Sequence, residues 1–598
     1  MIAYVAPLED MQFLLRELVT AQVLLEPSLL RQIDWDTLTQ ILEQAGIFAA
    51  EVLSPLNQIG DREGCRLEQG GVRTPSGWRE AYQRFTADGW NTVSCPSRLG
   101  GQGLSTVIAV LVEEMWHAAN PAFALCPMLT RSVIDALDIA ASYAIKERYI
   151  RELVGGRWTA TMTMTEPQAG SDLAAVKTVA LPRADGSYGL TGQKIFITYG
   201  EHDLTKNILH LVLARTPTAP AGIKGLSLFV VPRLIQTADG REAMSNHVRC
   251  LSIEHKLGMH GSPTCVLQFG SDRDGAATGW LVGEENRGLE YMFVTMNAAR
   301  LSIGIQGLGI AERAYQQALR YAKERKQGTD SPAGQSVPII HHADVRRMLL
   351  TMKSLTEAMR ALVCAVAEAI DRSHCHPDEP VRQRADAFVS LMTPVIKGWF
   401  TECAVEIASL NIQVHGGMGY IEESGAPQLL RDARITPIYE GTTGIQANDL
   451  VNRKIVPDRG QTAAELIATM RQECAQLTCS ASDSLRAFGQ WLAEAIDQLA
   501  QAVSQVVANG RAEPGRAPAT AQPLLMLFGV VTGGWQLARS AMAAERHLNA
   551  DQVSRRFGEA KILTACFYGD YILPRAAALK HTVVRGGQAT EMFAADRL

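Results

Sequence analysis

The chain has 598 residues, which at roughly 100–200 residues per domain corresponds to about three to five domains. Apolar residues make up 47% and charged residues 20%, close to the averages of globular proteins, so the composition excludes a disordered, collagen-like or coiled-coil chain as a whole. The net charge of -5 argues against a nucleic-acid binder, since such proteins usually carry a basic face.

Residues 1–155 predict a mostly helical N-terminal domain. Apolar residues recur with helical spacing over residues 104–116, where Glu113-Glu114 interrupts the apolar face. Glycine-rich turns separate the helical patterns at Gly89-Trp90 and at residues 100–103.

Residues 156–279 predict a β-domain, because short runs rich in β-branched and aromatic residues replace the helical pattern. The expected strands are residues 159–165, 177–181, 188–198, 208–214, 226–231 and 264–269. Asp185-Gly186 lies between two of them and is typical of a hairpin turn. No 10–15-residue helical pattern separates these strands, so we expect an antiparallel barrel or sandwich rather than βαβ units.

Residues 280–457 predict a C-terminal helical domain that resembles a four-helix bundle. Apolar spacing of i, i+3, i+4, i+7 predicts one helix over residues 345–366 and a second over 388–407, with a kink expected at Pro394. Residues 328–338, rich in Gly, Ser and Pro, predict a loop.

Residues 458–598 predict an additional C-terminal helical domain. Its clearest helices are residues 485–507 and 524–548, and residues 510–523, rich in Ala, Pro and Gly, predict a loop between them. The expected fold class is therefore α+β multidomain: helical, antiparallel β, four-helix-bundle-like and again helical.

Cysteine usage indicates a reducing compartment, because the eleven cysteines include no CxxC pair and their number is odd. We interpret His374-Cys375-His376 as a polar loop, since adjacent residues of a loop point apart and no second ligand pair lies at zinc spacing. The N-terminus lacks a basic secretory n-region, and the most apolar stretch, residues 524–531, is too short to span a bilayer. We expect a cytoplasmic protein.

Two short segments have both a structural and a chemical interpretation. Residues 165–172 (TEPQAGSD) follow a strand, and their small residues form either an ordinary strand-ending turn or a loop whose N–H groups and hydroxyls suit a phosphate or flavin edge. The glycines of residues 413–420 (QVHGGMGY) either cap a helix or let the backbone approach a phosphate. The segment does not follow a strand, as a dinucleotide-binding GxGxxG motif requires.

The third segment, residues 439–444 (YEGTTG), is equally open. Glu440, between an aromatic residue and a glycine, suits a catalytic carboxylate. The alternative is that the threonines cap a helix and Glu440 stabilises its first turn.

Together, the order and spacing of these segments resemble the acyl-CoA dehydrogenase family over residues 40–455. The matching positions are Gly89-Trp90, Pro96, 100–104, 165–172, 192–198, 256–264, 283–288, Arg300, Glu324-Arg325, 413–420, 432–434 and 438–446. Gln168 and residues 325–328, with the added C-terminal block, are similar to a long bacterial branch of the family.

The resemblance implies FAD-dependent removal of two hydrogens from an acyl-CoA thioester, which gives the trans-2-enoyl-CoA. Glu440 is then the base for the α-proton and flavin N5 the hydride acceptor, and burial of the carboxylate would raise its pKa toward the working range. The Glu440 N–H and a flavin ribityl hydroxyl would bind the thioester oxygen, and Gly441 would let the substrate approach. An electron-transfer flavoprotein is the expected electron acceptor.

The resemblance also assigns the cofactor and substrate contacts. The expected FAD contacts are Met162, Thr163, Met164, Thr165, Ser171, Phe196, Ile197, Thr198, Arg325, Gln327, His342, Gln413, Gly416, Gly417, Thr442 and Gln446. Phe196 would pack on the flavin face away from the substrate; it is also a candidate aromatic of the sheet core, and the two interpretations are compatible. The expected substrate contacts are Ser171, Asn297, Arg300 and Gly441, and no metal is expected.

The resemblance further predicts an obligate oligomer, because Arg325, His342 and residues 413–417 would hold the adenosine diphosphate end of a neighbouring subunit's FAD. A homodimer is expected, since the added C-terminal block would cover the surface that short relatives use to form tetramers. The family more often has Gln at position 342 and Asp at position 297.

Two alternatives to the dehydrogenase remain at this stage. The same scaffold supports an acyl-CoA oxidase that uses O2 and a non-catalytic DNA-binding relative, whereas a nitroalkane oxidase would have Asp in place of Glu440. The acyl chain also stays open between medium or long straight chains, branched chains and 3-methylthiopropionyl. Four methionines suit either a flexible acyl pocket or core packing: Met162, Met164, Met292 and Met296.

Overall fold

The computed structural model describes residues 4–19, 34–236, 243–271, 273, 275–329, 334–512, 516–549, 554–587, 590, 592 and 596. The chain folds into two compact units. Unit 1 comprises Met1–Gly46, Ser105–Ala118 and Ile303–Leu598, and unit 2 comprises Ile47–Leu104 and Ala119–Ser302. Residues 1–155 are therefore shared between the units, and the division into four domains stays a prediction.

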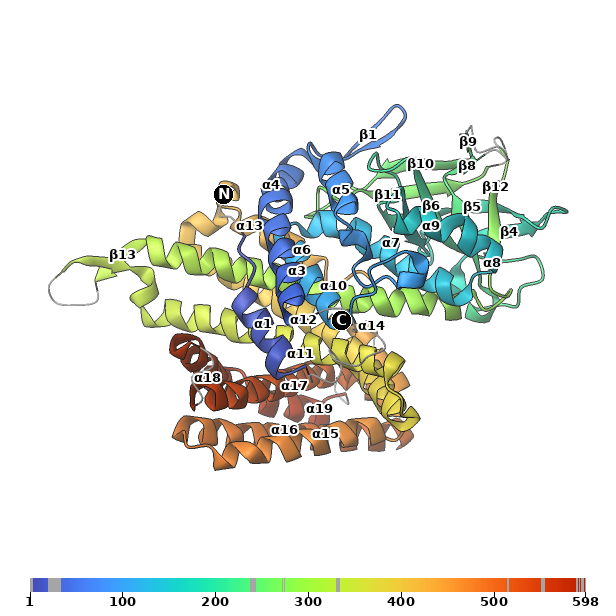
Figure 1. Cartoon of the computed structure of the whole chain (residues 1–598). Helices are drawn as coiled ribbons and strands as arrows, with labels where there is room; N and C mark the ends of the chain where they lie inside the picture. The colour runs from blue at the N-terminus through green and yellow to red at the C-terminus, as the bar shows by residue number, and fades with distance from the viewer. Residues whose placement is uncertain are drawn as a thin grey trace. The chain divides into compact units, whose positions relative to one another are not determined.

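An eight-stranded sheet forms the centre of unit 2, with the order β10-β11-β5-β12-β7-β6-β3 and with β4 beside β5 (Figure 1). The strands are β3 Trp158–Thr163, β4 Val179–Pro182, β5 Tyr188–Thr198, β6 Asn207–Ala214, β7 Ser227–Pro232, β10 Val248–Ile253, β11 Thr264–Phe269 and β12 Ala277–Val282. Short hairpins add β1 Arg66–Glu68 with β2 Gly71–Arg73 and β8 Leu234–Gln236 with β9 Ala243–Ser245. All six predicted strands are present, whereas β10, β12 and the hairpins were not predicted.

The expectation of a purely antiparallel sheet is wrong for one strand pair. β3 and β6 run parallel, with Thr161 opposite His210, while the other pairs of this sheet are antiparallel. A parallel pair needs a long crossover, which is usually a helix. Here residues 164–206 make the crossover with the β4–β5 pair instead, so the absence of a helical pattern did not exclude a parallel pair.

Apolar side chains of the strands form the core of the sheet, among them Val212, Phe229, Leu267 and Phe269. The helices that lie wholly within unit 2 are α4 Ser54–Glu63, α5 Trp78–Ala87, α7 Pro121–Ala140, α8 Tyr143–Ile145 and α9 Arg151–Val154, and the first part of α10 Gly288–Glu324, up to Ser302, also belongs to it.

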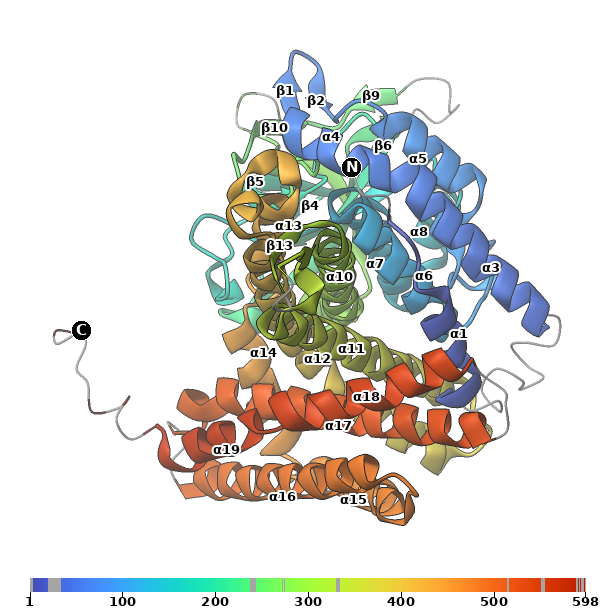
Figure 2. The ribbon, with the colours of Figure 1, turned by 90° about the vertical axis from the view of Figure 1, so that its left-hand side faces the viewer.

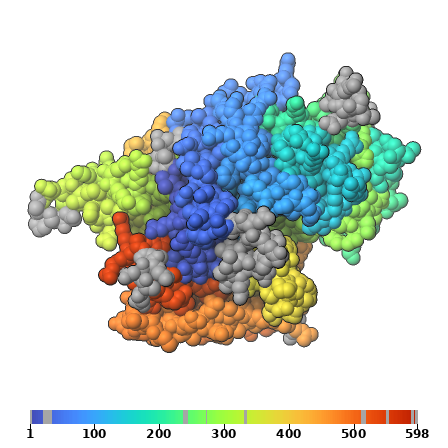
Figure 3. Space-filling model, viewed as in Figure 1, coloured from blue at the N-terminus to red at the C-terminus, as the bar shows by residue number. Residues whose placement is uncertain are grey.

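Unit 1 is helical, and three helices of its C-terminal part lie between two other pairs (Figures 1 and 2). In both views α17, α18 and α19 separate α11 and α12 from α15 and α16, and α15 and α16 form the orange surface in Figure 3. The helices with residues in this unit are α1 Leu8–Glu17, α3 Trp35–Phe48, α6 Thr106–Ala119, α10 Gly288–Glu324, α11 Ala343–Cys375, α12 Glu379–His415, α13 Ala426–Arg434, α14 Thr443–Asp449, α15 Gln461–Cys474, α16 Asp483–Ala512, α17 Arg516–Asn549, α18 Arg555–Tyr571 and α19 Arg575–Arg585.

Two predicted loops are largely regular structure. The segment 328–338 contributes to a two-stranded ladder of β13 Lys326–Thr329 and β14 Ser336–Pro338, while residues 330–333 lie outside the described residues. In the segment 510–523, α16 continues to Ala512 and α17 begins at Arg516, with residues 513–515 outside the described residues. Thr520 and Ala521, near the start of α17, are fully buried, so packing of this part of the helix outweighs the low helix propensity of Pro523.

In the part of the chain that the structure describes, we find no helix with the length and apolar character that a membrane span requires.

His260, in the connection between β10 and β11, gives unit 2 a pH-dependent contribution to stability. Its Nδ1 lies 2.9 Å from an Asp61 carboxylate oxygen, and its Nε2 lies 2.9 Å from the Lys256 carbonyl oxygen. Both acceptors lack protons, so both ring nitrogens donate and the ring is an imidazolium. The hydrogen bond to Asp61 raises the pKa of His260 to about 9.

We expect this contribution to be complete below the ordinary histidine pKa of about 6.5 and to be lost as the pH rises through about 9. Because His260 is partly exposed, the expected loss is about 1–2 kcal/mol. Unfolding of the wild type and of His260→Gln between pH 6 and 9.5 tests this, and the variant should lack the pH-dependent step. A step of equal size in both proteins would contradict it.

Candidate active site

The loop at residues 165–172 closes into a tight turn directly after β3. Glu166 and Ala169 exchange backbone hydrogen bonds of 3.0 and 2.9 Å, and the Ile195 N–H donates to the Thr165 carbonyl oxygen at 2.9 Å. An added Cβ on Gly170 would meet nothing within 4 Å, and Ser171 is exposed. The loop therefore fixes its backbone against β5 and leaves Gly170 and Ser171 open for a ligand.

A buried ion pair holds this loop in place. The Glu166 carboxylate accepts from Lys194 Nζ at 2.9 Å, and it also accepts from the Lys177 and Thr178 N–H groups and the Thr178 hydroxyl. Burial alone would raise the pKa of Glu166, but Lys194 and these donors lower it to about 2. Lys194 Nζ donates as well to the carbonyl oxygens of Met164 and Leu213, so the ammonium has an acceptor for each proton.

A β-bulge turns Phe196 out of the sheet. The ladder pairs Ile197 with Cys265 and Lys194 with Leu267, so two residues of β5 lie opposite one residue of β11. Phe196 has φ 60° and its side chain is 59% exposed, although strict alternation would place it on the buried face with Lys194. The interpretation of Phe196 as an aromatic of the sheet core is therefore wrong.

The other expected contacts of unit 2 lie on β3, β5 and α10. Met162 and Thr163 are buried in β3, Ile197 is buried in β5, and Met164, Thr165 and Thr198 are half-buried. On α10, Asn297 is exposed whereas Arg300, one turn later, is 4% exposed. Met292 is fully buried in the same helix and Met296 is partly buried.

In unit 1, the segment around Glu440 forms a strained turn. Glu440 has φ 53° and Gly441 has φ 91°, so two consecutive residues lie in the left-handed region. For a residue with a Cβ this conformation costs about 1–2 kcal/mol, and such strain collects at functional sites. The surrounding contacts must therefore hold the turn.

Two side chains hold the carbonyl groups of this turn. Lys397 Nζ donates to the Gly441 carbonyl oxygen at 2.6 Å. Gln446 Nε2 lies 3.2 Å from the Glu440 carbonyl oxygen and 3.3 Å from that of Gly441. A Cβ on Gly441 would lie 2.7 Å from this Nε2, so only glycine fits there.

The turn leads directly into α14. The Thr442 hydroxyl caps the helix by accepting from the Ile445 N–H at 3.3 Å, and the Thr443 hydroxyl donates to Glu402 at 2.6 Å. The helix-cap interpretation of the threonines is thus confirmed for Thr442. It does not compete with a chemical role of Glu440, because Glu440 precedes the helix in the left-handed turn.

A second group of expected contacts in unit 1 gathers at the end of α10. Arg325 and Gln327 are exposed, and His342 Nε2 donates to the Gln327 carbonyl oxygen at 2.6 Å. The ring of His415 stacks on that of Tyr321 at a centroid distance of 4.2 Å. This stack brings the segment that contains Gln413, Gly416 and Gly417, all exposed, to the end of α10.

Sequence reasoning missed the three side chains that support these segments: Glu166, Lys194 and Lys397. Lys194 is the only charge of β5 and directly precedes the apolar residues 195–197, Lys397 is a single charge within an apolar run of α12, and both are 0% exposed. A charge at a position whose periodicity predicts burial is the signal that could have identified them, because buried ammonium groups are rare unless paired.

Family models match four successive segments of the chain. They are described as the acyl-CoA dehydrogenase N-terminal domain at residues 36–157, the middle domain at 161–271, the C-terminal domain at 286–455, and an acetyl-CoA dehydrogenase C-terminal-like domain at 466–593.

Individual proteins agree with these matches. The chain is 47% identical over 580 residues to 3-methylmercaptopropionyl-CoA dehydrogenase of Ruegeria pomeroyi, which covers 96% of this chain and 97% of that protein. It is 32% identical over 607 residues to the broad-specificity linear acyl-CoA dehydrogenase FadE5 of Mycobacterium tuberculosis, with 97% of each chain covered. The crystal structure of Caenorhabditis elegans ACDH-11 in complex with C11-CoA has the same fold, with a TM-score of 0.77 at 20% identity and with 98% of this chain and 96% of that chain covered.

The expected resemblance to a long bacterial branch is thereby confirmed. Because these matches extend over nearly the whole chain, it belongs to the acyl-CoA dehydrogenase family and is an FAD-dependent oxidoreductase that acts on acyl-CoA thioesters.

Proposed function

We propose that the protein removes the α-proton and a β-hydrogen of an acyl-CoA to give the trans-2-enoyl-CoA, with Glu440 as the base. The observation that carries this proposal is the strained turn at Glu440, which Lys397 and Gln446 hold by their hydrogen bonds. The α-proton of a thioester is weakly acidic, so its removal needs a carboxylate fixed in one place. The Glu440 N–H is the proposed donor to the thioester oxygen, on which charge develops.

Three observations, each made within a single unit, support the binding of FAD. Phe196 presents an exposed aromatic ring from a strained position of β5. Among the described residues, Gln446 Oε1 is buried without a hydrogen-bond partner. An added Cβ on Gly416 or Gly417 would meet nothing within 4 Å, so the backbone there is open to a phosphate. When bound, FAD supplies the acceptor for the β-hydrogen at its N5 atom.

Four of the expected contacts have proposed roles that follow from the resemblance. Thr165 and Thr198 would donate to the flavin ring edge, and Ser171 would contact phosphate from the open loop. Arg325 would pair with the diphosphate of the partner subunit's cofactor. The complete proposed set is that of the sequence analysis, together with Asn297, Arg300 and Gly441 for the substrate.

We further propose a cytoplasmic homodimer that passes electrons to an electron-transfer flavoprotein. The exposed apolar side chains of Met418, Tyr420 and Ile421 adjoin the open glycines Gly416 and Gly417, and they support a second subunit at this place. The family and the expected reducing compartment support the acceptor and the location.

The acyl chain is tested directly by anaerobic titration of the yellow holoenzyme with a panel of acyl-CoAs. The substrate named for the Ruegeria pomeroyi relative makes 3-methylthiopropionyl-CoA the first compound of the panel, followed by butyryl-, octanoyl-, palmitoyl- and isobutyryl-CoA. We expect bleaching of the flavin by the thioether or a short straight chain, at least tenfold faster than by the branched one.

The same experiment separates the alternatives. Rapid reoxidation of the bleached enzyme by O2 would favour an acyl-CoA oxidase over a dehydrogenase. A yellow protein that no acyl-CoA bleaches would contradict the proposed reaction, and retention on DNA at moderate salt would then favour the DNA-binding alternative.

A further inference from the structure

We propose that Lys397 is a positioning residue for Glu440, which it fixes through the carbonyl group of Gly441. The inference rests on the proposed function, because it assumes that Glu440 is the base. It assigns a role in the reaction to a side chain of α12 that lies 43 positions before Glu440 in the chain.

The burial of Lys397 indicates that it is retained for a specific contact. Its side chain is 0% exposed, and its neighbours Val395, Ile396, Trp399 and Phe400 are equally buried. An ammonium group in such surroundings loses its hydration, and this loss must be compensated by close acceptors. The Gly441 carbonyl oxygen, 2.6 Å from Lys397 Nζ, is such an acceptor, and the contact is a short charge-assisted hydrogen bond.

The contact acts on the backbone where it is strained. Glu440 and Gly441 both have positive φ, and an unsupported glutamate would leave this conformation for the right-handed or extended region. Lys397 and Gln446 approach the Gly441 carbonyl oxygen together, and Gln446 reaches the Glu440 carbonyl oxygen as well. The peptide groups that follow the base are thereby held in one orientation.

The opposite side of the turn is anchored independently. The Thr443 N–H donates to the Pro437 carbonyl oxygen at 3.0 Å, and the Thr443 hydroxyl donates to Glu402. Loss of Lys397 therefore leaves the ends of the turn in place, while its centre keeps the longer hydrogen bonds of Gln446, at 3.2 and 3.3 Å, and loses the short charge-assisted one. Because proton transfer requires the base within hydrogen-bond reach of the α-proton, we expect the chemical step to suffer while substrate binding does not.

The test compares Lys397→Met with Lys561→Met, a matched control. Lys561 is another buried ammonium of unit 1, and it pairs with Asp10 and Glu357, away from the Glu440 turn. Each protein is prepared with FAD, its melting temperature and flavin spectrum are recorded, and its reduction by saturating acyl-CoA is followed anaerobically by stopped flow. The acyl-CoA dissociation constant and the isotope effect of α-deuterated substrate are measured in parallel.

We expect Lys397→Met to reduce its flavin at least 100-fold more slowly, with a dissociation constant within threefold of the wild type and an increased α-deuterium isotope effect. Lys561→Met should lose melting temperature and keep the reduction rate. Ethylammonium should restore part of the rate of Lys397→Ala in a saturable manner, which a merely structural lysine would not show.

The outcomes separate the inference from the proposed function. If no acyl-CoA reduces the wild type, the proposed function fails. If the wild type reacts and Lys397→Met keeps its rate within threefold, only the inference fails. If neither Lys397→Met nor Lys397→Gln yields folded, FAD-bound protein, Lys397 is required for folding and the positioning role is overturned.

Discussion

Replacement of Glu440 by glutamine is expected to slow flavin reduction by acyl-CoA by about 1,000-fold or more, because a general base contributes up to about 10⁴-fold and the amide accepts no proton. The change keeps the shape of the side chain and alters no backbone contact of the strained turn. We therefore expect normal FAD content and acyl-CoA affinity. Anaerobic stopped-flow reduction, with binding measured from the perturbed flavin spectrum, gives both quantities.

A control for the lost negative charge is Glu422→Gln, which removes an exposed carboxylate that pairs with Arg431 in the same unit. This variant should reduce its flavin at the wild-type rate. A Glu440→Gln enzyme that reacts as fast as the control would exclude Glu440 as the base. A second carboxylate of unit 1 would then have to be sought.

Sequence patterns predict the segments of the candidate site but not the contacts that hold them. The order of the motifs predicts roles for Glu440, Thr165 and Phe196, since each stands in a distinctive short segment. The supporting pairs join distant positions: Glu166 in the loop after β3 to Lys194 of β5, and Lys397 of α12 to Gly441 in a turn. No local periodicity couples such positions, so they become visible only in the folded chain.

The strands differ in the same way: those with a clear local pattern were predicted, and features that depend on distant parts of the chain were not. β5 and β11 have the predicted limits, because their alternating apolar residues are bounded by turn residues. β10 was missed because Val248 is its only buried residue, so alternation is absent, and β12 was missed because Gly279 interrupts a short run. The parallel pairing of β3 with β6 depends on the path of the chain between them, which neither strand encodes.

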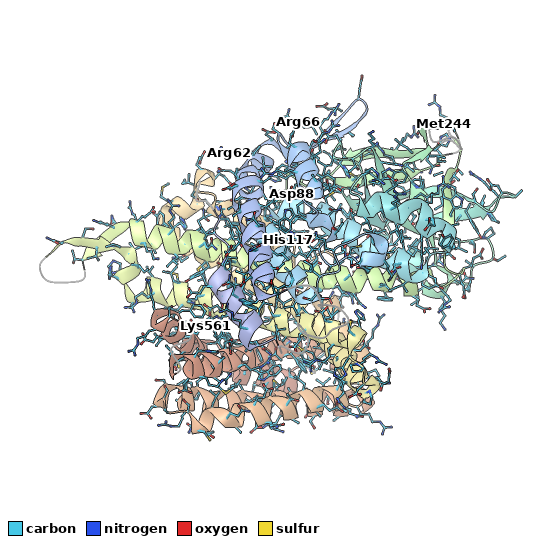
Figure 4. All side chains as sticks on the ribbon, viewed as in Figure 1. Arg62, Arg66, Asp88, His117, Met244 and Lys561 are labelled. Carbon is cyan, nitrogen blue, oxygen red and sulfur yellow. The ribbon has the colours of Figure 1, made fainter. Side chains whose placement is uncertain are left out.

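A buried cluster of charges in unit 1 shows most clearly which contacts cannot be predicted from local sequence. Arg360 of α11 donates to Asp10 of α1 at 2.7 Å, to Glu114 of α6 at 2.6 Å and to Glu312 of α10 at 2.5 Å. Lys561 of α18, labelled in Figure 4, pairs with the same Asp10. Each charge lies on a different helix, and four of the five would be assigned to a solvated helix face from local sequence alone. Glu114, which interrupts an apolar face, is the exception.

Arg360→Met is expected to destabilise unit 1 by about 3–5 kcal/mol, because it leaves three carboxylates buried without their common partner. The loss should depend on pH. Burial raises the pKa of Glu114 to about 7 even though Arg360 lowers it, so removal of Arg360 raises this pKa further. A carboxyl with a raised folded-state pKa favours the folded state at low pH and loses this contribution as the pH rises.

The loss in free energy of unfolding caused by Arg360→Met should therefore be smaller at pH 5.5 than at pH 8. Adding Glu114→Gln to the Arg360→Met protein should remove most of this pH dependence. Equilibrium unfolding in urea, monitored by circular dichroism, measures the free energy of unfolding at both pH values. The flavin-reduction rate, measured at urea concentrations well below the unfolding midpoint, shows whether the substitution also affects the reaction. If Arg360→Met were as stable as the wild type at pH 8, the attraction between the charges of the cluster would do no more than offset the cost of desolvating them. Buried ion pairs can often be replaced by apolar residues without a loss of stability. In that case the charges that join these five helices would determine how the helices are arranged rather than how stable they are.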